Sequence, residues 1–165
     1  MEWAHIPGPR WYRPELAAAA ADALVRAGTS GEAVQAVADL RYAVSNDHAG
    51  SLYPAAVPAA SVLVQVILER PGEARAYALS TLLDWWGTFG PEPGFEIYDD
   101  PAGGPAEIPE GIMRRVRQAA AALKLLAVGE NRRAINEVLR LLDQGWVVDE
   151  EWHRRIRRGR AGRSC

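Results

Sequence analysis

The 165-residue chain is long enough for one domain with a hydrophobic core, and 48% of its residues are hydrophobic, as in ordinary soluble proteins. No apolar run reaches the roughly 18 residues that span a bilayer, the start of the chain lacks the layout of a secretory signal, and Cys165 is the only cysteine. These features argue against a membrane protein and an internal disulfide, so we expect a cytoplasmic protein.

The net charge of −2 hides an asymmetry along the chain. Six arginines fall between residues 154 and 163, and no acidic residue follows Glu151. Without those six, 13 basic residues face 21 acidic ones, so an acidic body near −8 carries a basic segment.

Two helices are predicted at the start of the body. Helical periodicity runs from Pro14 to Gly28 through Leu16, Ala20 and Leu24. Thr29 and Glu32 have the spacing of a capping box. They open a second helix whose expected apolar face is Val34, Val37, Leu40 and Val44.

A second pair follows the segment SNDHAG. Pro54 suits the first turn of a helix, although Pro58 requires that the helix begins near Val57 or is kinked. The short link ERPG then leads to a fourth helix, so these two helices should pack antiparallel. Its expected inner face is Leu79, Leu82, Leu83 and Trp86.

The longest irregular stretch is a Gly- and Pro-rich insertion at 88–108, which separates the second pair from the third. Pro109 restarts the helical pattern, Gly129 ends it, and a last strong helix runs to Gly145. We expect one domain over 1–148, followed by a short basic helix and a frayed arginine-rich tail over 149–165.

The three helix pairs begin near Pro14, Pro54 and Pro109, and the first step of 40 residues lies at the HEAT repeat period. Over residues 14–144 the chain thus resembles HEAT-like repeat proteins. That resemblance implies an all-α fold, a short HEAT-like α-solenoid of three helical hairpins with a long loop insertion between hairpins two and three. The chain is also similar to small HEAT-like proteins of actinobacterial type, some of which are regarded as immunity or interaction proteins.

The connector SNDHAGSLYP contains Asp47, His48 and Tyr53. One interpretation is that Asp47 orients His48 as a general base. Adjacency in sequence does not imply such a contact, and no oxyanion donors are visible. Turn-forming residues fit a loop between repeats, and such loops are often used for binding.

The insertion is the stronger functional candidate, because long loops in compact domains are often functional. It contains acidic residues and no basic one, with Phe95, Tyr98, Asp99 and Asp100 as candidate contacts. Asp99 and Asp100 are also candidate ligands of a divalent cation, but the spacing of the EF-hand loop is absent from this stretch. Trp86 continues the apolar face of its helix, so Trp85 should be partly exposed as an anchor for a partner.

The arginine-rich tail is a candidate for phosphate binding through Arg154, Arg155, Arg157 and Arg158. Some HEAT-like proteins are DNA-repair glycosylases with a basic groove, but this body is acidic. A solubilising or self-associating tail that contacts the acidic body is the other interpretation.

Taken together, these features predict a non-enzymatic protein-binding module without cofactor or metal, and the resemblance adds an immunity or regulatory protein as its specific form. The expected partner is a basic protein, bound through Asp47, His48, Tyr53, Trp85 and the loop residues named above. The alternative is a protein that binds or processes nucleic acid through the tail and the pair Asp47 and His48.

Overall fold

A computed structural model describes residues 3–101 and 103–147. Within these residues the chain is mostly helical. Its six α-helices are α1 (Pro14–Arg26), α2 (Ser30–Val44), α3 (Ala56–Glu69), α4 (Glu73–Thr88), α5 (Ile108–Leu126) and α6 (Arg132–Gln144), with a short 3₁₀ turn at Gly129–Asn131 before α6.

The predicted helix starts are confirmed by local hydrogen bonds. Thr29 and Glu32 form the expected capping box: the Thr29 hydroxyl accepts from the Glu32 amide at 3.2 Å, and the Glu32 carboxylate accepts from the amides of Gly28 and Thr29. These amide hydrogen bonds lower the pKa of Glu32. Pro58 is accommodated because α3 begins at Ala56, which places Pro58 in the first turn, where an amide has no intrahelical acceptor.

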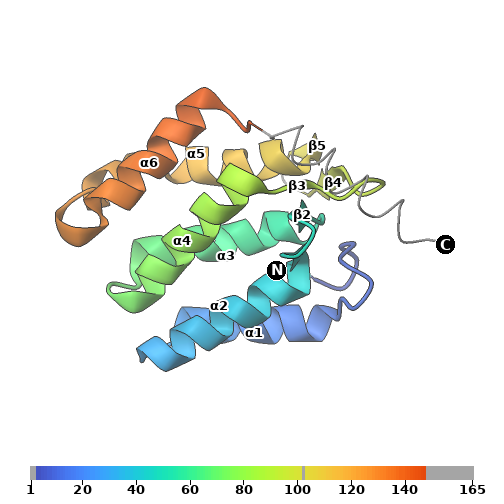
Figure 1. The fold of residues 1–165 in the computed structure, drawn as a ribbon, viewed down its shortest axis with the longest axis horizontal. Coiled ribbons are helices and arrows are strands. Elements are labelled where there is room, and N and C mark those ends of the chain that lie inside the picture. The colour runs from blue at the N-terminus through green and yellow to red at the C-terminus, as the bar shows by residue number, and fades with distance from the viewer. Residues whose placement is uncertain (1–2, 102, 148–165) are drawn as a thin grey trace.

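The helices pack as three successive pairs, α1 with α2, α3 with α4, and α5 with α6 (Figure 1). Between pairs, α3 packs against α1 and α5, whereas α4 packs against α2 and α6. The odd-numbered helices therefore follow one another on one side of the molecule and the even-numbered helices on the other, with α3 and α4 in the middle layer.

Two small sheets, which the all-α expectation missed, join the ends of these helices. The first contains β1 (Ser45–Asn46), antiparallel to β2 (Ser51–Leu52), which pairs in parallel with β3 (Gly90–Pro91). The second is the antiparallel hairpin of β4 (Ile97–Asp100) and β5 (Gly104–Glu107). The stretch at 88–108, expected to be irregular, thus contains three strands.

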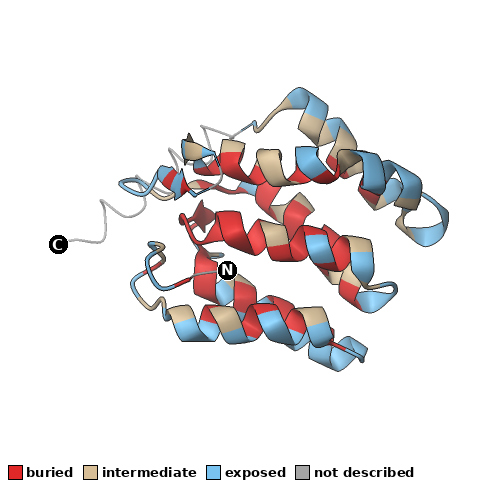
Figure 2. Ribbon diagram, turned by 180° about the vertical axis from the view of Figure 1, so that it is seen from behind, coloured by how far each residue is buried: buried red, intermediate tan, exposed pale blue. Residues whose placement is uncertain are grey.

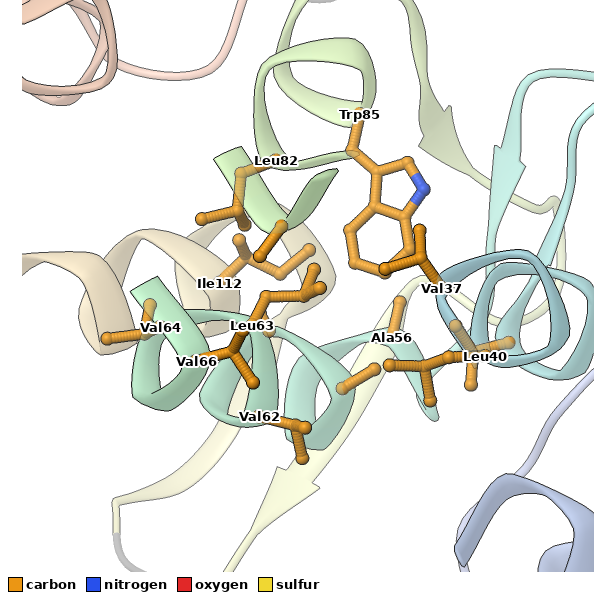
Figure 3. Packing of buried hydrophobic residues seen from close by; sticks show 14 of the residues in the cluster. Val37, Leu40, Ala56, Val62, Leu63, Val64, Val66, Leu82, Trp85 and Ile112 are labelled. Atoms are coloured by element: carbon orange, nitrogen blue, oxygen red, sulfur yellow. The ribbon is translucent and has the colours of Figure 1, made fainter. Parts of the chain in front are cut away.

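The core is centred on the middle layer (Figure 2). Ten of the 14 residues of α3 are buried, as expected for a helix that is apolar on all sides. The close approach of α5 to α3 depends on Gly111, since a Cβ there would lie 3.0 Å from the Val57 methyl groups. In Figure 3 the indole of Trp85 lies beside Val37 and Ala56.

The outer pair follows the predicted apolar faces in part, since Ala20, Leu24, Val37, Leu40 and Val44 are buried. Leu16 and Val34 were expected to face inward, but both are exposed. Alanines occupy much of the α1–α2 contact instead, among them Ala17, Ala21 and Ala36. Small side chains let two helices approach closely, so the larger residues are left at the rim.

Candidate functional site

A groove lies between α2 and α4, and we call it the α2–α4 groove. It encloses about 800 Å³. One wall is α2, the other is α4 at Tyr77, Ser80 and Thr81, and the end is closed by the β1–β2 turn at Asp47 and His48. Trp11, from the segment before α1, covers its edge.

The aromatic rim of the groove is formed by residues 31 positions apart. The Trp11 and Tyr42 rings stack with centroids 5.6 Å apart, and Trp11 Nε1 donates a hydrogen bond of 2.8 Å to the Tyr42 carbonyl oxygen. Tyr42 is nevertheless 66% exposed. A large aromatic ring held in place but open to solvent is suited to contact with another molecule.

Arg41 connects the two helices at the base of the groove. Its Nη2 lies 2.5 Å from Asp84 Oδ2 on α4 and 3.2 Å from Asp47 Oδ2 in the turn, and its guanidinium lies over the Phe89 ring at 5.9 Å. Burial disfavours the charged guanidinium, but the hydrogen bonds to Asp84 and Asp47 outweigh it and raise the pKa of Arg41. The arginine is therefore a fixed positive charge.

The carboxylates of the groove outnumber this cation. Asp39 and Asp47 line the groove, Asp84 binds Arg41 from α4, and all three keep solvent-accessible surface. Both α2 and α4 also end at this side, where helix C-termini carry partial negative charge. Asp84 does not itself line the groove, but when it is counted as the partner of Arg41, three carboxylates and one guanidinium leave an excess of two negative charges.

The structure places the predicted connector residues in different environments. Asp47 and His48 are exposed at the end of the groove. The Asp47 carboxylate binds Arg41 and accepts a hydrogen bond of 3.1 Å from the Ser45 hydroxyl. Tyr53 is buried and packs against Phe95 of the insertion, with ring centroids 5.2 Å apart.

The expectation that Trp85 is partly exposed is wrong, because this side chain is fully buried. Helix α4 is covered by α2, α3 and α6, so adjacent residues on it face different neighbours and both tryptophans are enclosed. Trp86 stacks on Trp146 with centroids 5.2 Å apart. The indole N–H of Trp85 has no hydrogen-bond partner among the described residues.

The hairpin residues divide between its two faces. Tyr98 and Asp100 are buried against α5, where the Arg115 guanidinium binds the Asp100 carboxylate and lies 6.0 Å from the Tyr98 ring centre. Burial, followed by the nearby Asp100 carboxylate, raises the pKa of Tyr98. Asp99 is exposed and Phe95 is 38% exposed, so of the four predicted contact residues of the insertion only these two remain open to a partner.

Neither Asp99 nor Asp100 lines the α2–α4 groove. These two loop acids therefore do not share that pocket with Asp47 and His48. Among the described residues, no three His, Cys, Asp or Glu side chains are grouped to hold a metal ion. The arginines proposed for nucleic acid, Arg154, Arg155, Arg157 and Arg158, lie outside the described residues.

Sequence reasoning missed the residues that shape the groove, Trp11, Arg41, Tyr42 and Asp84. One signal was present: Tyr42 lies off the apolar face of α2, so an exposed aromatic ring was foreseeable there. Its stacking on Trp11 and the bridge from Arg41 to Asp84 depend on tertiary packing.

Comparison with family models, curated proteins and solved structures gives no significant match. In the part of the chain that the structure describes, no helix combines the length and apolar character needed to cross a membrane. The function proposed below therefore rests on the residues of this chain.

Proposed function

We propose that this chain is a non-enzymatic protein-binding module, built on a short HEAT-like α-solenoid, that binds a basic segment of another protein in the α2–α4 groove. The repeat architecture is supported by the stacking of three helix pairs, in which α1, α3 and α5 contact one another in succession and so do α2, α4 and α6. Each unit of a solenoid packs on its neighbours in this way and leaves a long surface for partners.

One observation carries the binding function: an exposed, pre-positioned aromatic rim stands beside an excess of carboxylates. The rings of Trp11 and Tyr42 are fixed by their mutual stacking. A guanidinium or ammonium group is attracted both to an aromatic face and to carboxylates such as Asp39 and Asp47. A lysine or arginine side chain of the partner therefore fits this groove better than an acidic or apolar one.

An immunity or regulatory protein that neutralises a basic partner is the biological form of this proposal. Charge complementarity between an acidic surface and a basic partner speeds association. The acidic groove is unfavourable for the phosphates of nucleic acid, and the Asp47 carboxylate is engaged by Arg41 and Ser45. These features favour protein binding over the nucleic-acid alternative.

The test is affinity capture from the native lysate, followed by titration calorimetry with the captured protein. Two groove variants, Tyr42→Ala and Asp47→Asn, are compared with two matched hairpin variants, Phe95→Ala and Asp99→Asn. We expect a basic partner whose affinity falls about tenfold or more with Tyr42→Ala, as for an aromatic anchor, and stays unchanged with the hairpin variants.

The opposite pattern is an affinity for the partner that the hairpin variants weaken and the groove variants leave unchanged. That result would place the contact surface on the insertion and refute the proposed site. An affinity that none of the four variants changes would refute both surfaces.

A further inference from the structure

The described chain ends close to the α2–α4 groove. Trp146 stacks on Trp86, its Nε1 donates a hydrogen bond of 3.0 Å to the Phe89 carbonyl oxygen, and Trp86 Nε1 donates to the Gly145 carbonyl oxygen at 3.3 Å. The chain is thereby fixed to the C-terminal end of α4. Phe89 also contacts Arg41, which lines the groove. Phe89 thus contacts both Trp146, near the end of the described chain, and Arg41 of the groove.

The residues that follow carry the charge that the groove lacks. The arginine segment, residues 154–163, contains six arginines and no acidic residue. Arg154 lies eight positions after Trp146. An extended chain covers roughly 3.3–3.6 Å per residue, so this first arginine can lie up to about 29 Å from Trp146. That reach is sufficient to cross from Phe89 into an adjoining groove.

We infer that the arginine segment of the same chain occupies the α2–α4 groove when no partner is bound, and competes there with a basic partner. The inference rests on the proposed function, because it uses the same groove and the same charge complementarity. Its physical basis is tethering: a segment attached next to its site has an effective concentration of about millimolar for a short flexible linker, so even a weak contact is well populated.

The competition has a direct consequence for binding. The apparent affinity for a partner is reduced by the fraction of molecules whose groove is already filled. Replacing all six arginines of the segment by glutamine should therefore tighten binding of the captured partner. The variant keeps every described residue that lines the groove, because all six substitutions lie between residues 154 and 163.

The test uses Cys165, the only cysteine of the chain, as a site for a nitroxide spin label. Amide signals of the full-length, ¹⁵N-labelled chain are compared before and after reduction of the nitroxide. We expect loss of peak intensity for the groove amides of residues 38–48 and 80–81, and none for the turn Gly129–Asn131, which does not line the groove. The losses should disappear in the six-arginine variant and diminish with Asp39→Asn, whereas the control Glu130→Gln should leave them unchanged.

A second sample separates contacts within one chain from contacts between chains. A ¹⁵N-labelled chain without the nitroxide is mixed with spin-labelled chain at natural isotope abundance. Broadening of the groove amides in this mixture would show that the segment binds a second copy, and would overturn the intramolecular inference. Groove amides that are not broadened in the labelled chain would overturn it as well. If the groove amides are not broadened but Tyr42→Ala still weakens binding of the captured partner, the proposed function stands while the further inference fails. The two failures are therefore distinguishable.

Discussion

The buried carboxylate of Asp100 should be the main electrostatic attachment of the β4–β5 hairpin to the helices. Its side chain is 1% exposed and binds Arg115, whose side chain is 13% exposed, while Arg114 Nη1 lies 3.5 Å away. The hydrogen bond that Arg115 donates to the Asp100 carboxylate raises the pKa of Arg115. Substitution Asp100→Ala would leave Arg115 nearly buried without its counter-charge.

The expected cost follows from the burial of that pair. Removing one partner of a buried ion pair costs about 3–5 kcal/mol. Arg115 keeps a hydrogen bond of 3.3 Å from its Nε to Ser61, and Arg114 is more exposed, so the lower end applies. We therefore expect Asp100→Ala to reduce the free energy of unfolding by about 3 kcal/mol.

The assay is urea unfolding followed by far-UV circular dichroism, with Asp99→Ala as the matched control. Asp99 is the exposed neighbour of Asp100, and its substitution should change stability by no more than about 0.5 kcal/mol. The double variant Asp100→Ala with Arg115→Met should recover part of the loss, because it removes both charges. Equal unfolding midpoints for the two single variants would refute the assigned role of Asp100.

Three further predictions concern the core and the N-terminal segment. Trp85→Phe should destabilise less than Trp86→Phe in urea unfolding, because it removes a buried N–H that lacks an acceptor, whereas the Trp86 N–H is bonded; an equal loss would contradict this. Burial raises the pKa of Tyr12 to about 12 from 10.0, so its contribution to stability is complete below pH 10 and is lost as the pH rises towards 12. Tyr12→Phe should flatten the stability profile in that window, and an unchanged slope would count against it. Gly111→Val should lower stability by about 1–3 kcal/mol through overpacking against Val57. Gly87→Ala has open space at its Cβ and should raise stability by up to about 1 kcal/mol. Thermal melting that ranks the two variants the other way would show that α3 and α5 are not in close contact.

The helices could be predicted from sequence because their signals are local. A capping box satisfies amides within four residues, and a proline acts on the turn in which it lies. Thr29, Glu32 and Pro109 therefore gave helix starts close to those of the structure. The strands could not be predicted in the same way, since two-residue strands such as Ser45–Asn46 and Ser51–Leu52 are too short to show alternation.

The errors in the predicted faces arise from packing between elements. A periodicity argument assumes that a helix has one buried face. Helix α4 has neighbours on several sides, so Trp85 is buried together with Trp86. In α1 and α2 alanines are buried alongside Leu24 and Leu40, whereas Leu16 and Val34 are left exposed. The sequence does not indicate which neighbouring element covers which face of a helix.

The candidate site was predictable only in part. Asp47 and His48 were expected in a turn, and that turn closes one end of the groove. Their contact with a partner stays a prediction. The insertion was expected to present aromatic and acidic side chains, yet Tyr98 and Asp100 fasten it to α5. Which polar residues of a loop are used internally depends on the arginines opposite them, and those lie on a helix that follows the loop.

The most direct test of the central proposal maps where a basic ligand binds. The six-arginine-to-glutamine variant, ¹⁵N-labelled, is titrated with a hexa-arginine peptide, and with a hexa-glutamate peptide as the control. We predict chemical-shift changes for hexa-arginine in the α2–α4 groove, at residues 38–48 and 77–81, that are reduced by Tyr42→Ala and absent with hexa-glutamate. Shifts confined to the insertion at 92–107, or shifts spread over all acidic residues and unaffected by Tyr42→Ala, would contradict a binding site in the groove.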